Sequence, residues 1–145
     1  MLLLAACQPL RPQAELPPTV QRSNDVAFYA LSLFDTPYRY GGRRDGFDCS
    51  GFVQHVYLNT LGIKLPRTSA EMSRAGDALE DSQLQPGDLV FFNTSQKAYS
   101  HVGIYLGEQR FVHAPSSGKA IMMSNMFDSY WKNRYNGARR ITSRD

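Results

Sequence analysis

The pattern of apolar and polar positions predicts helices in the first half of the chain. Two segments carry apolar residues at the spacing of one helix face; Ser23 can cap the first, and Gly62 can end the second. Thr68 and Glu71 have the spacing of a capping box, which predicts a third, short helix. The expected helices cover 24–34, 49–61 and 69–75.

The second half of the chain, after Pro86 and Gly87, changes to short apolar runs separated by turn residues, a pattern typical of strands. Helices followed by a meander of short strands indicate an α+β fold, in which N-terminal helices pack on a central antiparallel β-sheet. The expected strands cover 88–92, 100–106, 110–114, 120–124 and 138–142, with a short helical turn at 128–133.

The N-terminal residues divide into a leader and a tether. Residues 1–7 form an apolar run that is too short to cross a membrane, which takes ~20 residues, and that lacks the basic start of a full signal peptide. We expect this run to be a truncated lipoprotein leader with Cys7 as the lipidation site, the true start lying upstream or the leader having been trimmed. A chance Leu/Ala start is the alternative. Residues 8–22 hold four of the eight prolines, which predicts an extended tether before a domain at 23–145.

Composition narrows the range of functions. A chain of 145 residues with 42% hydrophobic residues can bury one sizeable core without disulfides or metals. The net charge of +3 is too small to indicate nucleic-acid binding. Two cysteines, Cys7 and Cys49, exclude a disulfide framework and a four-cysteine zinc site.

Cys49 is expected at the first turn of the second helix, on the face that packs inward. Unpaired backbone N–H groups and the positive end of the helix dipole favour thiolate over thiol at such a position. We therefore expect a lowered pKa for this cysteine. Its position alone supports equally well a small buried apolar residue.

The histidines favour the reactive interpretation. His55 follows Cys49 at a spacing that turns it away on the helix, so we interpret it as a surface or packing residue. His101 and His113 lie on neighbouring predicted strands, with Gly103 marking a place of close approach. A three-residue loop at 106–108 would place the two imidazoles directly opposite each other on one face, whereas a two-residue loop would place them on opposite faces.

A cysteine at a helix start and two histidines on one hairpin face form a nucleophile, a base and a third group that orients the base. The alternative is a metal site. That site would have only three ligands, with no close-spaced pair and no apparent acidic fourth ligand.

Six blocks occur in order along the chain: FDCSGFVQHVY, LPRTSAEM, PGDLVFF, SHVGIYLG, RFVHA and YWKNRYNGARR. Together they resemble the NlpC family of bacterial cell-wall cysteine peptidases, and in particular its small lipoprotein murein endopeptidases. The resemblance covers residues 23–141. It implies a papain-like fold and hydrolysis of peptide bonds in peptidoglycan stem peptides or cross-links through a thioester intermediate.

The resemblance also implies roles for individual residues. Cys49 matches the family nucleophile, His101 the general base and His113 the orienting residue. Tyr38 matches a tyrosine near the oxyanion hole. The residues that match positions lining the substrate cleft are Asp48 and Ser50.

The expected partners are peptidoglycan stem peptides, a membrane reached through lipid on Cys7, and an envelope adaptor protein as a candidate; we expect neither a cofactor nor nucleic acid. The expected location is the cell envelope, as a lipoprotein facing the periplasm from the outer membrane. Two alternatives stay open: an amidase or acyltransferase on the same fold, and a non-catalytic module that binds the envelope.

Overall fold

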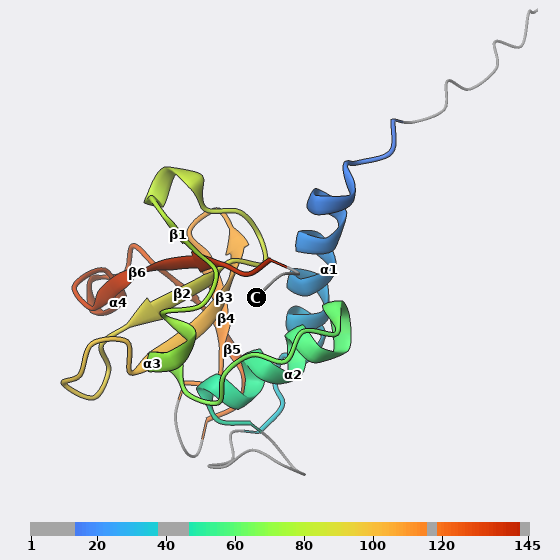
Figure 1. Cartoon of the computed structure of the whole chain (residues 1–145). Helices are drawn as coiled ribbons and strands as arrows, with labels where there is room; N and C mark the ends of the chain where they lie inside the picture. The colour runs from blue at the N-terminus through green and yellow to red at the C-terminus, as the bar shows by residue number, and fades with distance from the viewer. Residues whose placement is uncertain (1–13, 38–46, 116–118, 143–145) are drawn as a thin grey trace, which may run out of the picture.

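The computed structural model describes residues 14–37, 47–115 and 119–142. Two helices lie side by side and pack against one antiparallel sheet of six strands in the order β1-β6-β2-β3-β4-β5 (Figure 1). The helices are α1 (Pro18–Ser32), α2 (Cys49–Leu61), α3 (Ser69–Met72), the 3-10 turn η1 (Asp81–Gln83) and α4 (Ser129–Lys132). The strands are β1 (Asp77–Leu79), β2 (Leu89–Phe92), β3 (His101–Gly107), β4 (Arg110–His113), β5 (Met122–Asn125) and β6 (Tyr135–Arg140).

Helix α2 begins and ends as predicted, with Gly62 in the left-handed conformation after its last residue. Helix α1 begins at Pro18, well before the expected cap at Ser23. The physical reason is that proline at the first helical position lacks an N–H that would be unpaired anyway and already has a helical φ. Residues 18–22, expected in the tether, are therefore helical. Helix α3 is shorter than predicted, although the side chain of Thr68 accepts the N–H of Glu71 as expected.

Five of these strands fall within a few residues of their predicted ranges. Strand β1 was not predicted, because it is short, largely exposed and has little apolar pattern. It pairs with β6 at one edge of the sheet, and β5 forms the other edge. The chain order and the antiparallel sheet confirm the predicted α+β class.

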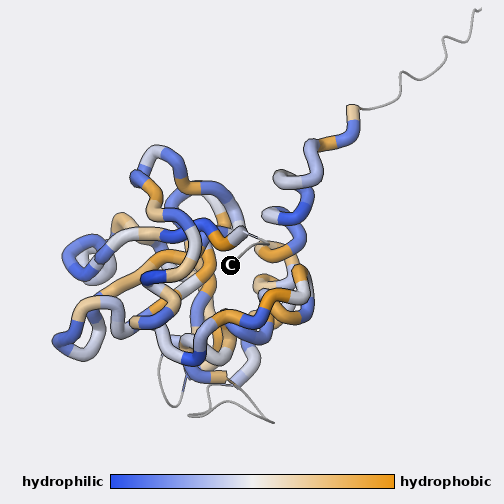
Figure 2. Tube along the Cα trace, viewed as in Figure 1, coloured by the Kyte–Doolittle hydropathy of each residue, from blue (hydrophilic) through white to orange (hydrophobic). Residues whose placement is uncertain are grey.

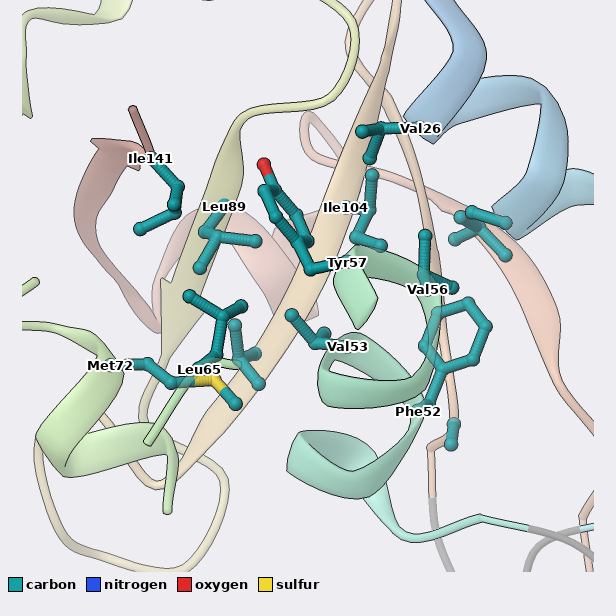
Figure 3. Packing of buried hydrophobic residues seen from close by; sticks show 14 of the residues in the cluster. Val26, Phe52, Val53, Val56, Tyr57, Leu65, Met72, Leu89, Ile104 and Ile141 are labelled. Carbon is teal, nitrogen blue, oxygen red and sulfur yellow. The ribbon is translucent and has the colours of Figure 1, made fainter. Parts of the chain in front are cut away.

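The sheet is covered on both faces around β2 and β3. One apolar cluster lies between the helices and the sheet, and Figure 3 shows Phe52, Val53 and Val56 of α2 directed toward the strands. Figure 2 shows that hydrophobic segments gather where α2 faces the sheet. A second cluster covers the opposite face and consists of Val90, Phe92, Tyr105, Phe111, Met126 and Ala138. Consequently every residue of β2 is buried, and β3 is buried from His101 to Tyr105.

The hairpin of β3 and β4 differs from the predicted one. Glu108 and Gln109, with φ of 51° and 64°, form a two-residue turn, and the pairing register shifts between Tyr105 and Gly107. The two-residue turn alone would place the imidazoles on opposite faces of the hairpin. The extra residue on β3 shifts the pairing by one residue and returns both imidazoles to the same face. The pairing of Ile104 with Val112 ends the ladder on this side, and one residue further along Gly103 lies close to His113, so His101 lies diagonally from His113. The predicted directly opposite pairing is therefore wrong, and the predicted shared face is confirmed by the hydrogen bond described below.

Gly103 leaves the space that this diagonal arrangement needs. A Cβ atom there would lie 2.7 Å from Cδ2 of Phe111 and 3.2 Å from Cβ of His113. We expect Gly103→Ala to lower the free energy of unfolding by about 1–3 kcal/mol, because the ring and the imidazole must shift in a packed core. Chemical denaturation measures this.

A suitable control is Gly62→Ala, which is strained by a φ of 67° but has nothing within 4 Å of the added carbon. It should lose stability while the His113 ring signals in NMR stay in place. A Gly103→Ala variant as stable as the parent protein would contradict the packing argument.

No helix among the described residues is long and apolar enough to cross a membrane.

Candidate active site

The site begins at the N-terminus of α2, where Asp48 caps the helix. Its Oδ1 accepts the backbone N–H of Gly51 at 2.7 Å, which pairs one of the donors that a helix start leaves open. Asp48 and Ser50 are both buried, on either side of the partly buried Cys49. The capping geometry therefore fixes where the sulfur leaves the helix.

Arg67 joins the two residues that flank Cys49. Its Nη1 donates to Ser50 Oγ at 2.7 Å and its Nη2 to Asp48 Oδ2 at 2.6 Å. The arginine lies in the segment between α2 and α3, and its side chain is 48% exposed. It thus connects the buried helix start to solvent. No role for Arg67 could be predicted from the sequence, because nothing near it in the chain shows that it meets Asp48.

The Cys49 sulfur accepts backbone hydrogen bonds from Val102 and Ser50, so it lies against the first residues of β3. Burial nevertheless raises the pKa of the Cys49 thiol, and the neighbouring Asp48 charge raises it further, while these two hydrogen bonds and Arg67 lower it. The expectation of a lowered pKa is therefore wrong, because desolvation of the thiolate outweighs the favourable helix start. At rest the site holds a neutral thiol that needs a base.

His101 and His113 form a buried imidazole pair. Nε2 of His101 lies 2.8 Å from Nδ1 of His113, and the side chains are 2% and 0% exposed. The contact occupies one ring nitrogen of His101 and leaves its Nδ1 for another partner. Because Val102 both follows His101 in β3 and donates its N–H to the sulfur, Cys49 lies against the residue next to His101.

Two further residues complete the surroundings of the imidazole pair. Ser124 on β5 places its Oγ 2.9 Å from Nε2 of His113. Trp131 on α4 stacks on His101 with ring centroids 5.5 Å apart and meets His113 edge-on at 4.9 Å. The sequence predicted Trp131 only as part of a short helical turn, and Ser124 only as part of a strand. Neither role could be found from the sequence, since each depends on which strand or turn lies across from the pair.

The imidazole pair should make stability depend on pH. Burial lowers the pKa of His101 from 6.5 to about 4. Burial, His101 and Lys119 lower the pKa of His113 well below 6.5. At a pH between the pKa of a histidine in the folded state and its pKa in the unfolded state, the unfolded chain binds protons that the folded chain does not. We therefore expect the free energy of unfolding to fall as pH drops from 6.5 to about 4, measured by urea denaturation at each pH.

A His101→Gln variant should lose the part of this slope that His101 contributes. A parent protein whose free energy of unfolding stays constant over the same range would contradict burial of neutral imidazoles.

The remaining predicted residues are placed as follows. His55 is a packing residue: its Nε2 lies 3.0 Å from the Tyr29 hydroxyl, and its ring lies against Phe47. Tyr38 and Cys7 lie outside the described residues. Within the part of the chain that the structure describes, no group of three or more His, Cys, Asp and Glu is placed to hold a metal ion.

The fold and the site together define a class of protein. It is an α+β domain in which a cysteine begins a helix that packs on an antiparallel sheet, beside two histidines on neighbouring strands. The NlpC/P60 family matches residues 35–140, and the chain belongs to this family. This confirms the resemblance seen in the sequence.

Relatives and solved structures agree with this membership. The chain is 45% identical to "Murein DD-endopeptidase MepS/Murein LD-carboxypeptidase" of Escherichia coli (strain K12), over 74% of this chain and 56% of that protein. It is 39% identical to "Probable endopeptidase NlpC" of the same strain, over 97% of this chain and 94% of that protein. The crystal structure of an NlpC/P60 family protein from Bacillus cereus ATCC 10987 matches with a TM-score of 0.75 at 33% identity, over 81% of this chain and 39% of that one. The chain thus spans about half the length of several curated relatives that it matches.

Proposed function

We propose that this protein is a cysteine peptidase that hydrolyses peptide bonds of peptidoglycan. The observation that carries the proposal is the buried imidazole pair beside a cysteine at a helix start. Relatives named murein DD-endopeptidases, 41% and 45% identical to this chain, support peptidoglycan as the substrate. Their names favour the cross-link between stem peptides as the bond that is cut.

The mechanism follows from the neutral groups at the site. Nδ1 of His101 takes the Cys49 proton as the sulfur attacks the substrate carbonyl, and His113 holds the imidazolium from the other side. The same proton passes to the leaving amine, which departs as the thioester forms. Water then attacks the thioester, again with His101 as base, and releases the carboxylic acid and the free thiol.

The negative charge that develops on the carbonyl oxygen during the attack needs hydrogen-bond donors to stabilise it. The backbone N–H of Cys49 and the hydroxyl of Tyr38 fill this role in the proposal, each worth ~2.7–4 kcal/mol in comparable sites. In the proposal Asp48 and Ser50 line the substrate cleft next to the sulfur, and Arg67 holds both side chains by hydrogen bonds.

Digestion of purified sacculi tests this function. The full chain is incubated with sacculi, and the soluble products are identified by mass spectrometry, with and without prior alkylation of the thiol. We expect cross-linked muropeptide dimers to be converted to monomers, and alkylation to stop the conversion.

Other products would identify the alternatives. Release of whole stem peptides from the glycan would indicate an amidase, and cleavage within a stem would move the cut bond away from the cross-link. Binding to sacculi without any product would indicate a non-catalytic envelope module and contradict the proposal.

We propose further that lipid on Cys7 anchors the protein in the cell envelope, facing the periplasm from the outer membrane. Support comes from the Leu-Ala-Ala-Cys run that ends at Cys7. Expressed behind a complete lipoprotein leader, the protein should sediment with membranes, whereas Cys7→Ser should appear in the soluble fraction. A Cys7→Ser protein that stays with the membranes would contradict the anchor.

An envelope adaptor protein stays a candidate partner, testable by crosslinking in cells.

A further inference from the structure

The hydrogen bond within the imidazole pair contains a single proton, and its position decides whether His101 can act as a base. Each neutral imidazole carries one N–H. If the shared proton belongs to Nε2 of His101, then Nδ1 of His101 is bare and can accept the thiol proton. If it belongs to Nδ1 of His113, then the proton of His101 must lie on Nδ1, where it blocks the thiol. The two rings therefore change tautomer together.

The productive arrangement places a proton on Nε2 of His113, and that N–H needs an acceptor. His113 is 0% exposed, so water does not reach this nitrogen from outside. Ser124 Oγ lies 2.9 Å away on β5, the edge strand, where the serine itself is partly buried. A buried N–H with no acceptor is costly. A hydroxyl can donate to a bare Nε2 or accept an Nε2–H. The productive tautomer therefore depends on the Ser124 hydroxyl as the acceptor of the His113 N–H in a closed core.

The other charged and titratable neighbours do not select this tautomer. Lys119 acts on His113 only through its charge, which disfavours a protonated ring. On the sulfur side, Cys49 already accepts N–H groups from Val102 and Ser50. In the proposed mechanism the thiol proton passes to Nδ1 of His101, which has a free lone pair only in the productive arrangement.

We propose that Ser124 is a positioning residue that holds both imidazoles in the Nε2–H tautomer, with the Ser124 hydroxyl accepting the proton of His113. This inference rests on the proposed function for its catalytic meaning, but the tautomers can be measured without any substrate.

Nitrogen NMR of protein labelled at histidine tests the proposal at neutral pH. Long-range proton couplings show which ring nitrogen carries the proton. We expect both His101 and His113 of the parent protein to be Nε2–H tautomers, Ser124→Ala to shift both rings toward Nδ1–H, and Ser124→Thr to restore them. Ser129→Ala, which removes an exposed hydroxyl on α4, is the matched control and should leave the spectrum of the pair unchanged.

Hydrolysis gives a second measurement. Ser124→Ala should lower kcat roughly tenfold with KM unchanged, the size expected when one buried hydrogen bond is lost, and Ser124→Thr should recover most of it. A parent His113 protonated on Nδ1, an unchanged tautomer in Ser124→Ala, or a failure of Ser124→Thr to restore it would each overturn the proposal. If Ser124→Ala does not fold, the parent protein and Ser124→Thr still decide. Absence of hydrolysis in the parent protein would instead contradict the proposed function.

Discussion

Cys49→Ala is expected to abolish hydrolysis of cross-linked muropeptides, with a loss on the order of 10⁴- to 10⁶-fold, because the thioester cannot form without the sulfur. The fold should survive. The side chain is only partly buried, so replacing it by alanine should change the free energy of unfolding by about 1 kcal/mol. Product formation by purified protein is followed by chromatography, and unfolding by circular dichroism.

The other cysteine provides the matched control. Cys7→Ser removes a thiol without touching the helix start and should hydrolyse purified muropeptides at the rate of the parent protein. Activity that survives Cys49→Ala would show that the nucleophile is another group or that hydrolysis does not pass through a thioester.

His101→Ala is expected to have the second-largest effect, a loss of about 10²- to 10⁴-fold in kcat, the range typical for a general base. The raised pKa of the Cys49 thiol makes this loss severe, because the sulfur does not ionise by itself near neutral pH. His113→Ala should retain part of the activity, since it removes only the group that orients and supports His101.

His55→Ala is the matched histidine control. This ring contacts Tyr29 and Phe47 between the helices, so its loss should lower stability while kcat stays unchanged. A His113→Ala variant as inactive as His101→Ala would contradict the orienting role and make His113 indispensable to proton transfer.

The sequence predicted the parts of the site that local rules control. The bounds of α2 follow from apolar spacing and Gly62, and the place of Cys49 at its first turn follows with them. The shared face of His101 and His113 was also expected from strand alternation. Their diagonal placement was not predicted, because no residue in the sequence marks the shift of pairing register after Tyr105.

The parts that sequence analysis missed depend on distant chain segments. Arg67 reaches Asp48, and Ser124 reaches His113, only because the fold brings those segments together. The direction of the Cys49 pKa shift could not be predicted for the same reason. The helix start is a local feature and favours the thiolate, but the desolvation that outweighs it comes from the core around the sulfur.

Because Ser124 lies on an edge strand of the sheet, catalysis should depend on local unfolding of that strand. Among the described strands, β5 has β4 alone as a neighbour, and its methionines are exposed. Its backbone hydrogen bonds should therefore open more readily than those of β2 or β3. Each such opening would detach the serine from His113 while the helix, the sulfur and the inner strands stay intact. On warming, kcat should therefore fall at temperatures where amide exchange in the inner strands is still slow. Activity should be lost before the domain unfolds.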